Sequence, residues 1–146
     1  MTLTPFVSNY GINTSVSSIN VSNFLVGATN NPTGDAESYA RWQRVGTFVR
    51  VEFQIQFATV GTTGALSINL PVPLSPLYQK PQSIFHIRYV TGDKVHYGFY
   101  NRANDNTINL VAQTTFGGAA NAVTSTAPDT LNVGDVLSGV ILYETV

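Results

Sequence analysis

Two histidines, His86 and His96, are the residues of this chain best suited to acid–base chemistry or metal binding. They lie in two alternating segments joined by residues 91–94, where a Gly-Asp pair predicts a hairpin turn. A simple turn would pair Tyr89 with His96 and His86 with Phe99. Because side chains alternate between the faces of a strand, this register places the imidazoles on opposite faces, so we expect no shared metal site. A turn with one residue more or fewer would instead place both imidazoles on the same face.

The acidic side chains offer a second kind of chemistry, because a glycosidase needs two carboxylates facing each other across a sugar-binding cleft. Most of the eight carboxylates lie beside Gly, Asn or Pro, where Asp commonly caps turns, so we expect solvated turn residues. The sequence leaves open that two of these carboxylates, distant along the chain, are brought together by folding. The eight residues are Asp35, Glu37, Glu52, Asp93, Asp105, Asp129, Asp135 and Glu144.

The sequence contains none of the common active-site motifs. It has no glycine-rich phosphate loop, no dinucleotide-binding fingerprint and no Gly-x-Ser-x-Gly elbow. Residues 104–106 lack the spaced ligands and the glycine of a calcium loop. A chain without cysteine has no thiolate nucleophile and no sulfur-based zinc site, and none of its serines has a base close in sequence. We therefore predict a protein that is not an enzyme and that carries no cofactor and no metal.

Charged residues are scarce and make up 10% of the chain, against about 25% in an ordinary soluble protein. The formal net charge is −1 and glutamates flank the arginines of residues 41–50, so we expect no nucleic-acid partner, which would need a concentrated positive field. No stretch approaches the ~20 apolar residues that cross a bilayer, so we expect no membrane insertion. The first residues have neither a basic start nor an apolar run, which predicts a protein that stays in the cytoplasm or leaves it inside an assembled particle.

Period-two alternation predicts the elements that would position any site. Apolar residues at odd positions from 49 to 57 alternate with Arg, Glu and Gln, which gives a strand one apolar and one polar face. A turn at 60–64 and a second alternating run predict a hairpin over residues 49–72. A second hairpin is expected at residues 83–100.

Two further strands are expected at residues 107–116 and 135–144. Both parities of the last strand are apolar, so it should lie centrally in a sheet or at a subunit contact. No segment has helical periodicity, and the spacing of Gly, Pro and Asn turns predicts an all-β, antiparallel β-sandwich or jelly roll over residues 38–146. The polar residues 1–37 are expected to form an N-terminal arm, with a short edge strand within residues 17–22.

The segment from Tyr39 to Val51 carries a resemblance to a known class of protein. An aromatic residue, then Arg-Val-Gly, then an alternating strand and a second strand that ends in Leu-Pro-Val at residues 70–72 resembles the β-sandwich modules of bacteriophage virions. The resemblance covers residues 39–73, and Thr47 stands where these modules often carry Asn. Such modules occur in head decoration (cement) proteins and in tail-fibre tips and receptor-binding proteins, and they are usually trimeric.

The resemblance implies, as a first hypothesis, a phage capsid decoration protein that binds the major capsid protein on the capsid exterior as a homotrimer. The alternative is a tail-fibre tip or receptor-binding domain that recognises host surface glycans through exposed Tyr and Trp side chains. A third hypothesis is a small polysaccharide hydrolase. In the first hypothesis the arm would contact the shell or a neighbouring copy through Phe6, Tyr10, Phe24 and Leu25.

Overall fold

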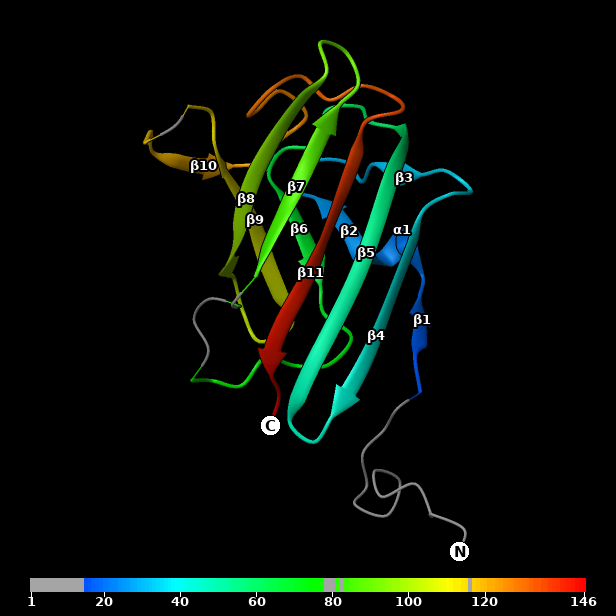
Figure 1. The fold of residues 1–146 in the computed structure, drawn as a ribbon, viewed down its shortest axis with the longest axis vertical. Helices are drawn as coiled ribbons and strands as arrows, with labels where there is room; N and C mark the ends of the chain where they lie inside the picture. The colour runs from blue at the N-terminus through cyan, green and yellow to red at the C-terminus, as the bar shows by residue number, and fades with distance from the viewer. Residues whose placement is uncertain (1–14, 78–80, 82, 116) are drawn as a thin grey trace, which may run out of the picture.

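The regular structure of the chain consists almost entirely of strands, as a computed structural model that describes residues 15–77, 81, 83–115 and 117–146 shows (Figure 1). All strand pairs in it are antiparallel, which confirms the prediction of an all-β antiparallel fold. The elements are β1 (Ser17–Ile19), α1 (Val21–Phe24), β2 (Leu25–Gly27), β3 (Thr33–Gly34), β4 (Tyr39–Val45), β5 (Phe48–Thr59), β6 (Leu66–Asn69), β7 (Ile84–Tyr89), β8 (Lys94–Arg102), β9 (Thr107–Gln113), β10 (Ala120–Ala122) and β11 (Val136–Glu144).

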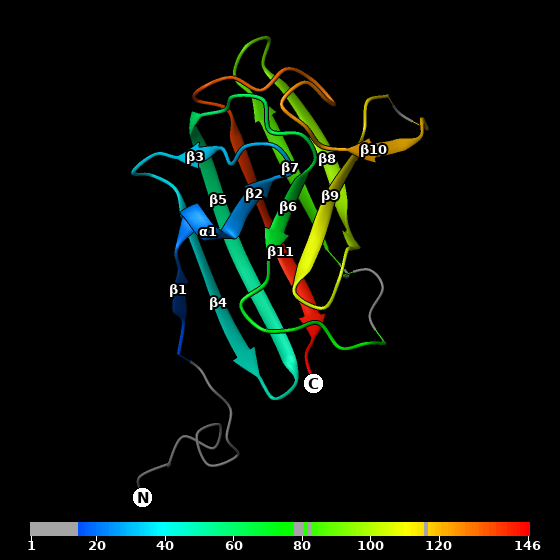
Figure 2. The same ribbon diagram turned by 180° about the vertical axis from the view of Figure 1, so that it is seen from behind.

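The strands form one continuous sheet in the order β1-β4-β5-β11-β7-β8-β9-β6-β2, with β10 on β9 and β3 on β5. The sheet curls like half a barrel, so β9, β6 and β2 lie behind β5, β11 and β7 (Figures 1 and 2). α1 packs against β4 near one end of the sheet and against β2 and β6 at the other. The curl therefore encloses one hydrophobic core between its two ends.

The core is built from the period-two pattern of the strands. The odd-numbered side chains of β5 from 49 to 57 point inward and are each at most 1% exposed, whereas the even-numbered ones point outward. Phe24 of α1 reaches the same interior, where its ring lies 5.2 Å from that of Phe53. Asn20 starts this single helical turn, because its side chain accepts the Ser22 backbone N–H at 3.1 Å.

The predicted hairpin over residues 49–72 is wrong, because β5 does not pair with β6. β5 lies between β4 and β11, and β6 lies between β9 and β2. Alternation determines which side chains share a face, but it does not determine which strand lies alongside. The tight turn at Gly46, whose φ of 60° suits glycine, joins β4 to β5, while residues 60–65 carry the chain across to the opposite layer.

The hairpin over residues 83–100 is confirmed, with a register two residues away from the predicted one. Tyr89 pairs with Lys94 and His86 with Tyr97, so the loop occupies residues 90–93. Asp93 has a positive φ of 48°, a conformation that Asp tolerates better than most residues. A shift of two residues preserves parity, and the two imidazoles lie on opposite faces as predicted.

The strand predicted at 107–116 is present as β9, and β11 lies centrally, between β5 and β7, as its two apolar faces predicted. The described part of the predicted arm is joined to the sheet: β1, which is the expected edge strand, pairs with β4, and β2 pairs with β6. Residues 15–37 therefore pack with the rest of the fold.

Candidate interaction face

The outward side chains of β4, β5, β11, β7 and β8 form one broad surface, which we call the outer face. It holds seven of the twelve large hydrophobic side chains that are exposed among the described residues, together with charged side chains such as Arg50, Glu52 and Arg88. Exposed apolar side chains scattered singly are ordinary, but contiguous patches mark interaction sites. The seven are Tyr39, Val45, Phe48, Ile84, Val95, Tyr97 and Leu142.

The strand registers place several of these side chains close together, whereas Tyr39 pairs with Gln54 and Val95 with Arg88. Val45 pairs with Phe48 across the β4–β5 turn. Leu142 donates its backbone N–H to Ser83 Oγ at 3.1 Å, which holds β11 beside the start of β7. Apolar positions therefore run across the outer face from the β4–β5 turn to β8.

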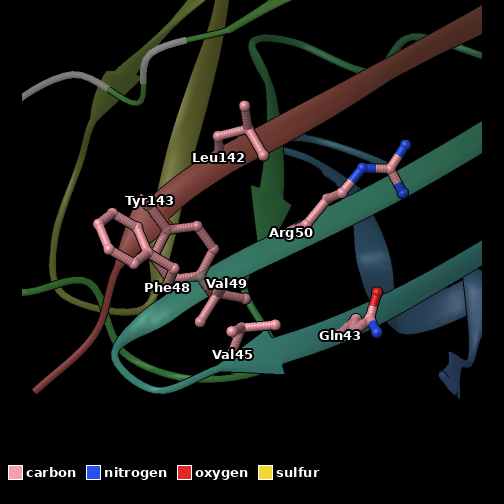
Figure 3. A pocket seen from close by; sticks show the side chains of 7 residues that line it. All are labelled: Gln43, Val45, Phe48, Val49, Arg50, Leu142 and Tyr143. Atoms are coloured by element: carbon pink, nitrogen blue, oxygen red, sulfur yellow. The ribbon is translucent and has the colours of Figure 1, made fainter. Parts of the chain in front are cut away.

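A hollow of about 370 Å³ lies at the β4–β5 end of the outer face; we call it the Phe48 groove (Figure 3). Phe48 is 59% exposed there, and Val45 and Leu142 are 42% and 43% exposed. Ligand pockets of this size normally combine apolar walls with a few convergent polar groups. Gln43 and Arg50 are the polar residues here, so the groove is suited to an apolar side chain. Its full lining is Gln43, Val45, Phe48, Val49, Arg50, Leu142 and Tyr143.

A charge cluster borders the Phe48 groove. Glu52 accepts hydrogen bonds from Arg50 and Arg41, each at 2.8 Å, and from the Tyr39 hydroxyl at 3.3 Å. The Arg50 and Arg41 hydrogen bonds hold the pKa of the Glu52 carboxyl below its usual range. Arg44 donates instead to the Gly46 carbonyl oxygen at 2.7 Å. The arginines of this segment are thus engaged within the chain.

The two histidines have different partners, as their opposite faces require. His86 Nε2 lies 3.0 Å from Ser138 Oγ on the outer face, and His96 Nδ1 lies 3.4 Å from the Gln113 carbonyl oxygen. A serine beside an imidazole base is one component of nucleophilic catalysis, and sequence reasoning missed this pair because 52 residues separate its members. No carboxylate among the described residues bonds to His86, so the pair lacks the acidic group that orients the histidine of a catalytic triad. The pair also lies on an open sheet surface and not in an enclosed site.

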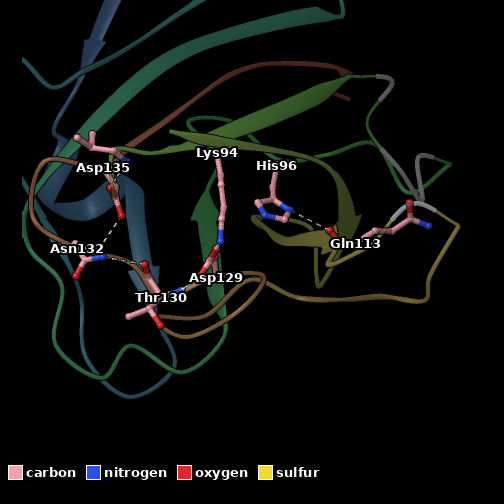
Figure 4. Close-up of polar contacts among 8 residues, drawn as sticks. Lys94, His96, Gln113, Asp129, Thr130, Asn132 and Asp135 are labelled. Carbon is pink, nitrogen blue, oxygen red and sulfur yellow. Dashed lines mark hydrogen bonds and ion pairs between the residues drawn. The ribbon is translucent and has the colours of Figure 1, made fainter. Parts of the chain in front are cut away.

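A second hollow, of about 360 Å³, lies beside Tyr97 on β8; we call it the Tyr97 hollow. Tyr97 is 65% exposed, and the other lining residues are mostly polar. Figure 4 shows its neighbours His96 and Gln113 together with the Lys94–Asp129 ion pair of 2.8 Å. Lys94 lowers the pKa of the Asp129 carboxyl. The lining residues are Val95, His96, Tyr97, Gln113, Thr114 and Thr115.

Most of the carboxylates are engaged by other parts of the fold. Asp135 is fully buried and accepts the backbone N–H groups of Val90 at 2.8 Å and Asn132 at 2.7 Å. Within the described ranges, no three His, Asp or Glu side chains gather where they could hold a metal ion. The carboxylates in ion pairs with Arg or Lys are Glu52, Asp93, Asp105 and Asp129.

The four residues predicted to form shell or subunit contacts fall into two groups in the structure. Phe24 and Leu25 are 0% and 2% exposed in the single chain and belong to its core. Phe6 and Tyr10 lie outside the described residues. The apolar outer face was not predicted as a site, although the double-sided apolar pattern of residues 135–144 was a signal of it.

Comparison of this chain with protein-family models, curated proteins and solved structures finds no match. A search of the described residues finds no helix long and apolar enough to span a membrane.

Proposed function

We propose that this chain is a bacteriophage virion protein, a decoration protein that binds the outer shell as a homotrimer and stabilises it from the capsid exterior. The observation that carries the proposal is the group of exposed hydrophobic side chains on the outer face, which five adjacent strands form. The segment that resembles virion modules, residues 39–73, contributes β4 and β5 to this face. The two layers of the curled sheet support the sandwich architecture that the resemblance implies.

The proposed mechanism is burial of the outer face between subunits and against the shell. Phe48 and Ile84 are 59% and 61% exposed in the single chain, so both have area to lose. Full burial of one such side chain contributes about 1.5–3 kcal/mol. This free energy exists only in the assembled particle, so by mass action it opposes dissociation of the shell. Scarce surface charge favours such packing, because few charged groups must be desolvated.

The experiment that tests this proposal is quantitative mass spectrometry of purified particles of the source phage, combined with native mass spectrometry of the isolated protein. We expect a trimer, and a copy number comparable to that of the major shell protein. A monomer that is absent from the particles would refute the proposal. A trimer present at a small fraction of the shell copy number would assign it to the tail.

The Tyr97 hollow supports a second candidate function, recognition of host surface glycans by a tail-fibre tip. An exposed tyrosine ring can stack on a sugar, and His96, Gln113 and Thr115 offer hydrogen-bonding groups beside it. The test is a glycan array probed with the protein and with the Tyr97→Ala variant. Binding that the variant loses supports this function, and no binding by the unaltered protein at high concentration excludes it.

A further inference from the structure

One row of residues crosses the outer face from β4 to β8, and each of its members comes from a different strand. The registers of four strand pairs align one residue each on β4, β5, β11, β7 and β8, which lie side by side in Figure 1. Residues paired in this way point to the same face, with Cβ atoms about 5 Å apart. We call this set the tyrosine row, because a tyrosine stands at each end; it consists of Tyr39, Gln54, Ser138, His86 and Tyr97.

The middle of the tyrosine row is neutral and forms hydrogen bonds. Gln54, Ser138 and His86 offer an amide, a hydroxyl and an imidazole, which between them can both donate and accept. Ser138 Oγ lies 3.0 Å from His86 Nε2, so these two side chains are oriented by each other. None of the five members is Asp, Glu, Lys or Arg. The row therefore suits a ligand that presents hydroxyl groups.

The charged side chains in the neighbouring rows already have partners. Arg41 and Arg50 are each paired with Glu52 at 2.8 Å, and Arg88 is paired with Asp93 at 3.5 Å. An acidic ligand would have to displace these carboxylates from their arginines, whereas an uncharged ligand would leave them in place. The surroundings of the row therefore favour a ligand without charge.

The two terminal tyrosines present oriented ring surfaces. Tyr97 is 65% exposed, and its ring centroid lies 6.2 Å from that of His86. Tyr39 is 39% exposed; its hydroxyl donates to Glu52 at 3.3 Å, and Arg41 Cζ lies 5.4 Å from its ring centroid. These contacts hold both rings without burying them. A held aromatic ring with an apolar face and a polar tip is suited to stacking on a sugar ring.

The span of the tyrosine row sets the length of the ligand. Its ends are separated by four strand spacings of about 4.8 Å, which is about 19 Å in all. This distance is several times the width of a pyranose ring, so a single sugar cannot touch both ends. A ligand that contacts both tyrosines must be an extended chain of sugars.

We propose that the tyrosine row binds an uncharged, extended oligosaccharide, which stacks on the two tyrosines and forms hydrogen bonds with the three residues between them. The inference rests on the second candidate function, glycan recognition, and extends it from the Tyr97 hollow across the outer face to β4. The row lies apart from the Phe48 groove, because Gln54 is six residues from Phe48 along β5, about 20 Å. The Phe48 end can therefore be buried between subunits while the row binds a glycan.

Isothermal titration calorimetry of the full chain tests the proposal. The probes are neutral oligosaccharides of one to six sugars, built from glucose, galactose, mannose or N-acetylglucosamine, and oligogalacturonate is the acidic comparison. We expect at least one neutral series to bind, with an affinity that rises at least tenfold from the monosaccharide to the hexasaccharide, because only a chain reaches both ends of the row. Oligogalacturonate of the same length should bind at least tenfold more weakly.

Matched variants show where the oligosaccharide binds. Tyr39→Ala should weaken hexasaccharide binding at least tenfold, whereas Tyr39→Phe keeps the ring and should retain most of the affinity. Gln54→Ala should weaken binding at least fivefold. Its control is Gln56→Ala, because Gln56 lies on the same face of β5 one row away and should leave the affinity within twofold. A thermal melt of each variant separates a lost contact from a lost fold.

Four results would overturn the proposal. Binding that Tyr97→Ala abolishes but that Tyr39→Ala and Gln54→Ala leave intact would confine recognition to the Tyr97 hollow, and the second candidate function would stand without the row. An affinity independent of chain length would mean a site for one sugar, and stronger binding of oligogalacturonate would mean an acidic ligand. No binding of any neutral series at millimolar concentration would refute the row and the glycan function together.

Discussion

Replacing Asp135 with asparagine tests how the fold holds the loop that leads into β11. The Asp135 carboxylate is fully buried and accepts two backbone N–H groups, from Val90 at 2.8 Å and Asn132 at 2.7 Å. These bonds tie the end of β7 to the loop before β11, and the Asp135 carbonyl adds a third tie by accepting the Phe57 N–H at 2.9 Å. Asp135 therefore lies where three segments that are distant in sequence meet, and Figure 4 shows its bond to Asn132.

The magnitude follows from the two side-chain bonds. Asparagine keeps the shape of the side chain but has one acceptor oxygen, so its NH2 group would face a backbone N–H. One charge-assisted bond, worth about 1.5–3 kcal/mol, is lost, and the other becomes a weaker neutral bond. We expect Asp135→Asn to lower the free energy of unfolding by about 2–4 kcal/mol, and Tm by about 5–15 °C for a chain of this length.

The assay is urea unfolding followed through the fluorescence of Trp42, the only tryptophan. Asp93→Asn is the matched control, because the Asp93 side chain is 84% exposed and its ion pair with Arg88 spans 3.5 Å. Asparagine also tolerates the positive φ of this residue, so we expect a change below about 0.5 kcal/mol. If the two variants lost equal stability, the assignment of Asp135 as the link between these segments would be wrong.

Burial raises the pKa of Tyr89 to about 12, so the unfolded phenol ionises first and the free energy of unfolding should fall as pH rises from about 10 to 12. Urea titrations should show a shallower fall in Tyr89→Phe, and an unchanged slope would contradict this. Gly98→Ala would place a Cβ 2.3 Å from Phe85 Cζ, so it should lower stability by about 1–3 kcal/mol in the same assay; a neutral effect would refute the close packing. On the outer face, Ile84→Ser should reduce the trimer fraction in sedimentation velocity, whereas Val133→Ser should not, and equal fractions would count against this face.

The sequence predicts which segments form strands better than it predicts which strands pair with each other. The alternation in β5 and the double-sided apolar pattern in β11 are local, so both strands could be recognised from residue types alone. Pairing depends on how loops route the chain. Residues 60–65, between β5 and β6, can close a hairpin or cross to the opposite layer, and only packing decides between these paths.

The candidate site was harder to predict for the same reason. The outer face collects side chains from strands that lie far apart in sequence, such as Phe48 and Tyr97. Ser138 meets His86 across 52 residues. Phe24 and Leu25 looked like arm contacts because polar residues surround them, but both side chains lie in the core. The face of the hairpin on which each histidine lies was predictable, by contrast, because a register error of two residues leaves every side chain on the same face.

The pattern of β11 bears on the proposal that the outer face is buried between subunits. Ile141 and Tyr143 point into the core, where the curled layer of β9, β6 and β2 covers them. Leu142 points the other way and is 43% exposed, with no covering layer supplied by the described residues. A strand that is apolar on both faces is normally covered on both. In the proposed trimer, a second copy of the chain would supply this cover.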